Sequence, residues 1–249
     1  MPRDIRLGNL FNVRDLGGYV TRDGRTVRWE RVYRAASLHQ LDPEHADDWD
    51  RLGLSTVVDL RRPRERTAGG WPQLLDSAVV CELPVLPDGW TLPKEQFSSP
   101  TEHLSYAYDD MARLGADAVR RTFELLADPD RYPLMFFCLA GKDRTGIMAV
   151  LLLTALGVDE ATALDDYELS GDRVVALVEH LKAQDTLDRT NPMINQPLEV
   201  LRAPRVAMAE ALDRMKVQHG SILGYLDSCG IGEAMREAVR AQLLETPSR

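Results

Sequence analysis

The chain has 249 residues, of which 44% are hydrophobic and 28% charged, and its formal net charge is −9 at pH 7. This is the composition of a globular protein that buries a core, and it argues against a disordered, fibrous or membrane-embedded chain. The acidic balance also argues against nucleic acid as a partner, because phosphate backbones are held by basic surfaces.

The N-terminal residues lack the apolar core of a signal peptide, and the longest apolar run, 147–158, is too short to span a bilayer. The three cysteines, Cys81, Cys138 and Cys229, are odd in number and far apart, which fits a reducing compartment. The five histidines are scattered singly, so no metal site and no cofactor are expected. We therefore expect a cytoplasmic protein without stable membrane insertion; secretion without a classical signal peptide stays open.

In the first part of the chain, the patterns predict a hairpin over 18–35 around an Asp23-Gly24 turn, and then a helix over 41–53 with Asp42 as its N-cap. Short buried strands are expected over 55–61 and 78–85. The four prolines of 84–100 predict a long loop, which in a compact domain is either disordered or functional.

A helix is expected over about 102–126, followed by an apolar strand over 133–138 and an apolar helix over 144–157. Strands that alternate with helices indicate an α/β domain with a mostly parallel central sheet flanked by helices. The rest of the chain predicts an additional C-terminal helical part, with a polar break over 184–197. We expect 1–249 to form a single domain, in which 171–203 is a candidate helical lid or insertion.

The stretch "CLAGKDRTG" (138–146) connects the apolar strand to the apolar helix. Cysteine is often simply buried, so Cys138 has a plain interpretation as a core residue. The following residues favour another: a glycine turn before a helix N-terminus gathers backbone N–H groups into a cradle for an anion. Arg144 follows Cys138 after five intervening residues, a C-x5-R spacing, and its guanidinium offers a planar fork to two phosphate oxygens. The same positive field favours a thiolate at Cys138.

This segment resembles the phosphate-binding loop of protein tyrosine phosphatases, and most closely that of a bacterial group within the family. "NVRDLGGYVTRDGRTVRWERVYRAASL", "LGLSTVVDLRRPRE" and "GSILGYLDSCGI" resemble the same group. The resemblance implies the α/β tyrosine-phosphatase fold and a metal-independent reaction. It also implies that Cys138 attacks phosphorus to give a phosphocysteine and that Arg144 clamps the phosphate. One departure is Phe137, where phosphatases commonly have a histidine. The expected phosphate-binding residues are Leu139, Ala140, Gly141, Lys142, Asp143, Arg144 and Thr145.

A leaving alkoxide or phenoxide needs a proton, so a carboxylic acid is expected near the cradle. Asp59 ends a predicted parallel strand, whose C-terminal end borders the ligand crevice, and it resembles the proposed general acid of the bacterial group. Alternatively, it only anchors its loop or pairs with Arg61. Asp143 is a candidate for activating the water of the second step, or else it only holds the loop. Asp88 is a further candidate acid.

We interpret the chain as a protein tyrosine phosphatase, and dual specificity stays open. Its expected partners are a phosphorylated protein or a phosphoinositide, with phosphate or another oxyanion bound in the loop. Lys142 faces either solvent or substrate. The loop also resembles that of lipid phosphatases, in which the lysine at this position contacts additional phosphates, so a phosphoinositide phosphatase is the alternative. A phosphate-binding module without turnover is a second alternative. The basic run 61–66 is expected to steer anions, and 13–18 to brace the loop.

Overall fold

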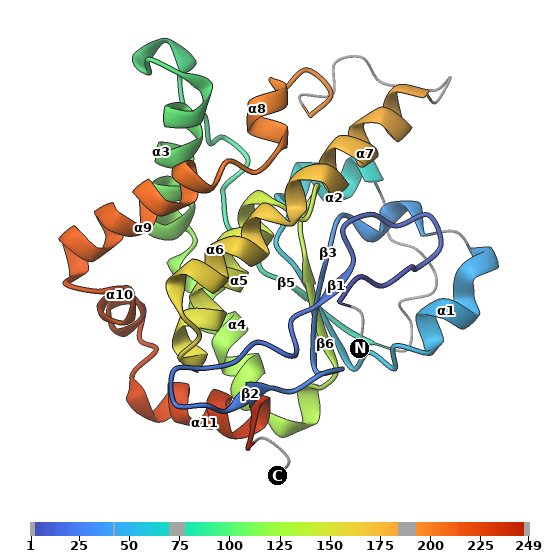
Figure 1. Cartoon of the computed structure of the whole chain (residues 1–249). Coiled ribbons are helices and arrows are strands. Elements are labelled where there is room, and N and C mark those ends of the chain that lie inside the picture. The colour runs from blue at the N-terminus through green and yellow to red at the C-terminus, as the bar shows by residue number, and fades with distance from the viewer. Residues whose placement is uncertain (1–2, 42, 70–77, 184–192, 247–249) are drawn as a thin grey trace.

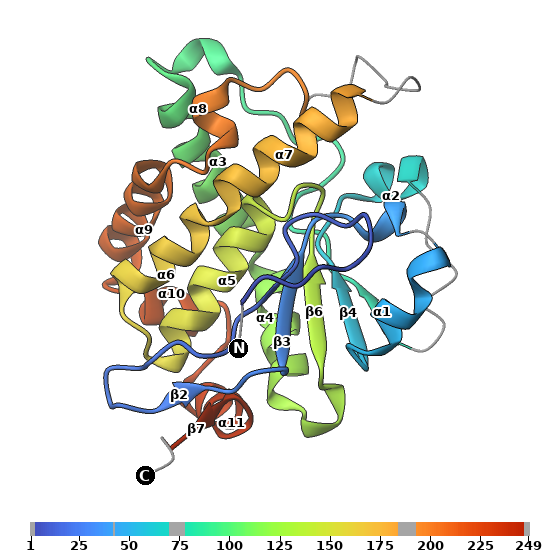
Figure 2. The ribbon, with the colours of Figure 1, turned by 45° about the vertical axis from the view of Figure 1, so that its right-hand side comes forward.

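The computed structural model describes residues 3–41, 43–69, 78–183 and 193–246. A five-stranded sheet in the order β1-β3-β6-β4-β5 lies between helices on its two faces (Figures 1 and 2). Its strands are β1 (Arg14–Asp15), β3 (Val32–Ala35), β6 (Leu134–Phe137), β4 (Thr56–Asp59) and β5 (Val79–Glu82). β1 runs antiparallel to β3 and the other paired strands are parallel. The predicted α/β class with a mostly parallel sheet is confirmed.

Alternate side chains of β6 enter two different cores, as the two-residue period of a strand requires. Leu134 and Phe136 belong to the larger core. There they pack with the helices α3 (Pro100–Leu114), α4 (Ala116–Ala127) and α5 (Asp143–Leu156). Met135 and Phe137 face the opposite way, into a smaller core with Trp49 of α1 (Ala46–Asp50). Both faces of the central strand are therefore dry, which explains its unbroken apolar sequence.

The C-terminal part is helical, as predicted. It comprises α6 (Glu160–Glu168), α7 (Ser170–Ala183), α8 (Leu198–Leu201), α9 (Arg205–His219), α10 (Ile222–Ser228) and α11 (Glu233–Leu243). Most of these helices contribute to the larger core, and that core reaches from Leu16 to Leu244. Beyond α11, β7 (Leu244–Glu245) pairs with β2 (Thr26–Val27), so the end of the chain returns to its N-terminal part (Figure 1).

Two predicted elements differ from the structure. The prediction of a single hairpin over 18–35 is wrong for the second half of that range. The turn closes a short pairing in which Val27 N–H donates to the Tyr19 carbonyl, but β3 then leaves to join the main sheet beside β6. The expected helix over about 102–126 is two helices, because Gly115 adopts a non-helical conformation between α3 and α4. Local periodicity cannot reveal either event, since partner strands and helix breaks are chosen by tertiary packing.

The remaining regular segments are short. The helix expected over 41–53 is a 3-10 turn (Pro43–His45) followed by α1, and its predicted cap, Asp42, lies outside the described residues. α2 (Pro63–Gly69) follows β4, and the loop after β5 contains one 3-10 turn, Lys94–Gln96. Further 3-10 turns are Leu38–Gln40 and Pro129–Arg131. The carboxyl ends of β3, β6, β4 and β5 meet at one edge of the sheet, which is where an α/β protein forms its ligand crevice.

Candidate active site

A cavity of about 660 Å³ opens at this edge of the sheet. One wall is formed by residues 138–145, which we call the anion loop; all of its residues except Gly141 and Thr145 line the cavity. Apolar residues form much of the opposite wall, including Leu86, Trp90 and Phe97 from the predicted loop 84–100. Val174 of α7 and Val200 of α8 close another side, so the segment 171–203 contributes to the cavity through its described residues.

The anion loop has the backbone geometry that the sequence predicts. Cys138 follows β6 directly, is only 2% exposed and lines the cavity. Gly141 has φ of +65°, and a Cβ there would lie 2.5 Å from the Ala35 carbonyl oxygen, so only glycine fits. α5 begins at Asp143. Within the described part of the chain, no backbone carbonyl accepts from the N–H groups of 139–145, which leaves these donors for an oxyanion.

Arg144 reaches the cavity from the first turn of α5, and Glu65 of α2 holds it. The two side chains form a bidentate pair, with Nη1 2.5 Å from Oε2 and Nη2 3.0 Å from Oε1. Burial alone would raise the pKa of Glu65, but the hydrogen bonds and charge of Arg144 lower it to about 2. Burial opposes the charge on Arg144, yet nearby Cys138 and Glu65 raise the guanidinium pKa above its ordinary value. The Arg144 guanidinium is therefore positively charged, and its orientation is fixed.

Glu65 is not among the site residues predicted from the sequence, because it lies within the basic run 61–66. A local signal was present. Pro63 and Glu65 occupy the first and third positions of α2, and Glu65 Oε2 accepts from the N–H of Arg62 at 2.7 Å. This is the acidic half of a capping box, which marks a helix start and fixes the carboxylate close to it. The signal locates Glu65 at a helix N-terminus, but nothing local indicates Arg144 as its partner.

Asp143 is the carboxylate of the anion loop that borders the cavity. Its side chain is 28% exposed, and Oδ1 accepts from the hydroxyl of Tyr108 at 2.7 Å and lies 3.2 Å from Lys142 Nζ. Tyr108 is itself paired with the hydroxyl of Tyr167 at 2.6 Å. Burial, followed by the charge of Asp143, raises the pKa of Tyr108 well above its ordinary value, so the phenol stays protonated and donates. The carboxylate is therefore held at the cavity while remaining accessible.

Asp59 is fully buried at the end of β4 and is not among the residues that line the cavity. Its two oxygens accept from the guanidinium of Arg61 at 3.0 to 3.2 Å, and Oδ1 also accepts from the Arg61 N–H at 2.9 Å. Arg61 in turn donates to the hydroxyl of Ser37 at 2.8 Å. Asp88, the other candidate, accepts from the N–H of Arg64 and does not line the cavity either. This geometry favours the alternative in which Asp59 anchors its loop.

Two polar side chains of the anion loop, those of Lys142 and Thr145, are buried. Lys142 is 3% exposed and lines the cavity, and its Nζ donates to the Val200 carbonyl of α8 at 2.6 Å, so its ammonium group does not face bulk solvent. The hydroxyl of Thr145 is buried and has no hydrogen-bond partner among the described residues. Phe137, at the position that is commonly histidine, packs in the smaller core with the Arg61 guanidinium 5.1 Å from its ring centre.

Behind the anion loop lies a group of polar residues, of which the sequence predicted only the segment 13–18 as a support for the loop. Asn12 and Arg34 donate to the carbonyls of Ala140 and Gly141. The prediction that 13–18 braces the loop was therefore close in position, although side chains outside that segment make these contacts. Two further observations concern the described residues only. They contain no cluster of histidine, cysteine, aspartate and glutamate that could hold a metal ion. None of their helices is both long and apolar enough to cross a bilayer.

A mostly parallel sheet with an N–H-rich loop at its carboxyl edge is typical of α/β proteins that bind anions. Comparison with known sequences narrows this class: the model of the tyrosine phosphatase family matches residues 5–245. The chain belongs to the tyrosine phosphatase family, and the predicted enzyme class, a protein tyrosine phosphatase, is confirmed.

Relatives match along most of the chain. A protein of Cupriavidus necator, assigned by its name to the tyrosine-protein phosphatases, is 31% identical over 233 residues, which cover 90% of this chain and 82% of its own. The triple specificity protein phosphatase PtpB of Mycobacterium tuberculosis is 28% identical over 286 residues, covering 96% and 98%. A solved structure of P. aeruginosa TpbA in complex with pTyr covers 84% of this chain and 91% of its own, at 14% identity and a TM-score of 0.37.

Proposed function

We propose that this chain hydrolyses phosphotyrosine through a phosphocysteine formed at Cys138. The observation that carries the proposal is the meeting of Cys138, the N–H groups of 139–145 and the Arg144 fork at one end of the cavity. In the first step the sulfur–phosphorus bond forms as the bond from phosphorus to the tyrosine oxygen breaks. Water then attacks phosphorus and releases phosphate and the thiolate. Fixed donors stabilise the charge on the equatorial oxygens in both steps.

We propose Arg144 as the phosphate clamp and Glu65 as the residue that holds it in position. A guanidinium presents five N–H donors, and the pair with Glu65 uses two of its terminal nitrogens. The remaining donors can turn to phosphate oxygens while the carboxylate keeps the plane of the fork fixed. Because a side chain as long as arginine has many rotamers, this preorganisation lowers the entropy lost when phosphate binds.

For the proton transfers we propose Asp143, which in its protonated form would donate to the leaving oxygen and, as the resulting carboxylate, would accept a proton from the attacking water. Three features support it: the carboxylate borders the cavity, it is partly exposed, and Tyr108 orients it. Asp59 and Asp88 are weaker candidates, because their carboxylates are engaged elsewhere and do not line the cavity. The original hypothesis for Asp59 remains testable by the variant discussed below.

A phosphoinositide substrate is the second candidate, and one observation favours it. Arg62, Arg64 and Lys94 line the cavity beyond the anion loop, where they are placed to meet additional phosphates. Lys142 also lines the cavity, but its ammonium group already donates to the Val200 carbonyl and lies 3.2 Å from Asp143 Oδ1, which leaves it fewer donors for such a phosphate. The apolar wall around Trp90 and Phe97 instead suits a tyrosine ring.

One experiment separates these candidates. Turnover of a phosphotyrosine peptide, a phosphoserine peptide and a phosphoinositide panel is measured in the presence of a chelator, with Cys138→Ser as the inactive control. We expect the highest kcat/KM on the phosphotyrosine peptide. Preference for a phosphoinositide would support the second candidate. Phosphate binding with no turnover of any substrate would contradict both and leave a binding module.

We propose that 1–249 acts as one phosphatase domain in which 171–203 is the wall or lid of the cavity. The larger core supports this, because it includes residues of the sheet and of the C-terminal helices. We also propose a cytoplasmic location, supported by the free thiols of Cys81, Cys138 and Cys229. Cell fractionation tests the location, and recovery of the chain outside the cell would contradict it.

A further inference from the structure

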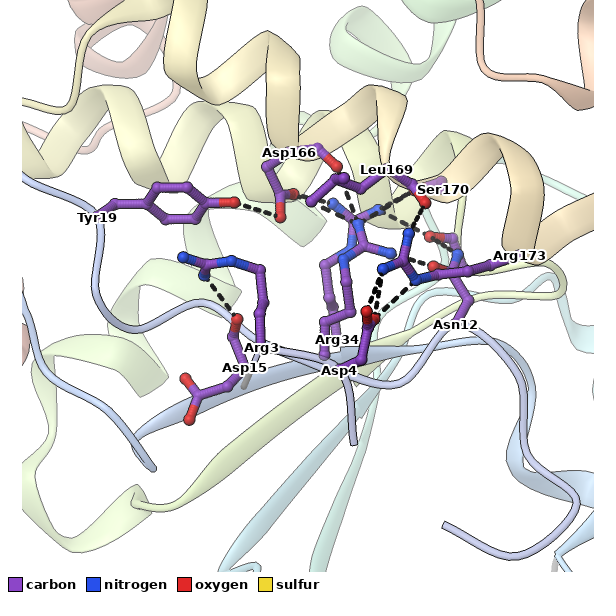
Figure 3. A network of polar contacts seen from close by, with 12 residues as sticks. Arg3, Asp4, Asn12, Asp15, Tyr19, Arg34, Asp166, Leu169, Ser170 and Arg173 are labelled. Atoms are coloured by element: carbon purple, nitrogen blue, oxygen red, sulfur yellow. Dashed lines mark hydrogen bonds and ion pairs between the residues drawn. The ribbon is translucent and has the colours of Figure 1, made fainter. Parts of the chain in front are cut away.

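A buried ionic network lies next to the anion loop, and Figure 3 shows several of its members, including Tyr19, Arg34, Asp166 and Ser170. It contains the guanidinium groups of Arg14 and Arg34 and the carboxylate of Asp166, all with 0% exposed side chains. The carboxylate lies 2.5 Å from Arg34 Nη1 and 3.6 Å from Arg14 Nη2, and it also accepts from the hydroxyl of Tyr19 at 2.9 Å. Burying ions is costly unless each is paired and hydrogen-bonded. A network maintained at this cost, so near the anion loop, calls for a functional explanation.

The network connects the sheet to the C-terminal helices. Arg14 and Arg34 come from β1 and β3, while Asp166 lies in the last turn of α6 and Ser170 begins α7. Arg14 Nη2 donates to the Asp166 carbonyl at 3.0 Å, and both arginines lie 3.2 Å from the Ser170 hydroxyl. These contacts leave little freedom for either guanidinium. The network is therefore a rigid support.

Two side chains carry this support to the anion loop. Asn12 Nδ2 donates to the Ala140 carbonyl at 3.1 Å and to the Gly141 carbonyl at 2.9 Å. Arg34 Nη2 donates to the same Gly141 carbonyl at 2.8 Å. Arg14 Nη1 donates to Asn12 Oδ1, which fixes the amide so that its N–H groups face the loop. Asn12 has φ of +59°, a conformation that asparagine tolerates better than most residues.

The direction of these carbonyls determines the direction of the neighbouring amides. In a trans peptide the C=O and the following N–H point to opposite sides. The Ala140 carbonyl shares its peptide with the Gly141 N–H, and the Gly141 carbonyl with the Lys142 N–H. Because both carbonyls are drawn back toward the network, both N–H groups point away from it. A cation at the carbonyl also polarises the peptide and strengthens its N–H as a donor.

We infer that Asn12 and Arg34, fixed by Arg14 and Asp166, are positioning residues that turn the Gly141 and Lys142 amides toward the phosphoryl group. They do not touch the substrate themselves. Two guanidinium groups against one carboxylate also leave positive charge behind the loop, which favours the anion in front of it. The inference rests on the proposed function only in taking the anion loop as the site that binds the phosphoryl group.

Two variants test the inference. Asn12→Asp keeps the side-chain size and the tolerance for positive φ but removes both donors to the loop. Arg34→Lys keeps the charge but loses the planar fork. Binding of orthovanadate, which mimics the transferring phosphoryl group, is measured by calorimetry alongside kcat and KM for a phosphotyrosine peptide. The matched control is Arg173→Gln, because Arg173 pairs with Asp4 at the exposed edge of the same group and does not contact the anion loop (Figure 3).

We expect each test variant to weaken orthovanadate binding by about tenfold or more, somewhat less than the loss of a direct oxyanion donor. kcat should fall together with the affinity for orthovanadate, while KM changes less, because the amides act mainly on the transition state. Combining the two variants should weaken binding by less than the product of the single effects, since both act on the Gly141 peptide. Arg173→Gln should behave like the wild type.

A folded Asn12→Asp or Arg34→Lys variant that binds orthovanadate as tightly as the wild type would overturn the inference. Circular dichroism establishes folding, and if Asn12→Asp does not fold, the charge-conserving Arg34→Lys decides. Failure of the proposed function looks different: the wild type would turn over no phosphomonoester, but the comparison of orthovanadate affinities would still test the support. A wild type that does not bind orthovanadate would overturn both.

Discussion

Two arginine–carboxylate pairs border the same end of the sheet, and they differ in what surrounds them. Arg61 and Asp59 are 1% and 0% exposed, and Asp59 also accepts from a backbone N–H. Arg144 and Glu65 are 10% and 12% exposed, and both line the cavity. The first pair is buried and does not line the cavity, so we expect it to stabilise the loop after β4 and to take no part in catalysis. The second pair holds a guanidinium at the cavity, where a bound anion can also accept from it. We therefore expect the position of a pair relative to the cavity, and not the pairing itself, to distinguish a catalytic pair from a structural one.

Arg144→Lys should have the largest effect on chemistry. Lysine keeps the charge but cannot bind two phosphate oxygens with a planar fork, and it loses the bidentate pair with Glu65. We expect kcat/KM for a phosphotyrosine peptide to fall by about a thousandfold, in the range seen when a transition-state arginine is lost. Steady-state kinetics measure it. The matched Arg61→Lys variant should lower the melting temperature instead, and an equal loss of kcat/KM per folded molecule in both would refute the distinction.

Asp143→Asn removes the proposed proton donor but keeps a side chain that can accept from Tyr108. General acid–base groups contribute about a hundredfold or more, so we expect kcat to fall by roughly that factor on an alkyl phosphate. With a leaving group that needs no proton, such as a nitrophenolate, the effect on the first step should be much smaller. The measurement is single-turnover formation of the phosphocysteine with both substrates. Equal losses on both would contradict the role of Asp143.

Glu65→Gln should have a moderate effect. The glutamine still accepts one hydrogen bond from Arg144 but loses the charge, so we expect kcat to fall by roughly tenfold from a less ordered fork. The pKa of Glu65 is lowered from 4.5 to about 2, and the carboxylate therefore stabilises the folded state above pH 4.5. This contribution is lost as pH falls through about 2.

Denaturant titrations over that pH range check the second half of the prediction. The wild type should be more stable than Glu65→Gln near neutral pH, and the difference should shrink on acidification. A difference in stability that stays constant down to pH 2 would mean that Glu65 is not ionised against Arg144 in the folded state.

Asp59→Asn should have the smallest effect on chemistry and a large one on stability. Breaking a buried ion pair leaves Arg61 uncompensated, and the free energy of unfolding should fall by about 3 to 5 kcal/mol. Any loss of kcat per folded molecule should be the same for good and poor leaving groups. If the loss is instead concentrated on poor leaving groups, Asp59 is the general acid after all and the comparison between the two pairs reverses.

Much of the site was predictable because its main parts are contiguous. Cys138, Gly141 and Arg144 lie within seven consecutive residues of a strand, loop and helix. The backbone of such a segment is set by local rules, namely a glycine for the positive φ and a helix start for the free N–H groups. The carboxylates were harder to assign. Asp59 and Asp143 both fit the chemistry of an acid, and only their surroundings distinguish a dry, saturated carboxylate from one at the cavity wall.

The sequence by itself determined the α/β class and the strand–loop–helix form of the anion loop, and it predicted which residues would meet an anion, because strand periodicity and loop geometry act over a few residues. Only the tertiary structure decided which distant groups support them. Glu65 is 79 positions from Arg144, Arg34 is 107 from Gly141 and Asn12 is 129 from it. Such contacts arise because the carboxyl ends of the parallel strands gather at one edge, and no spacing along the chain encodes that meeting.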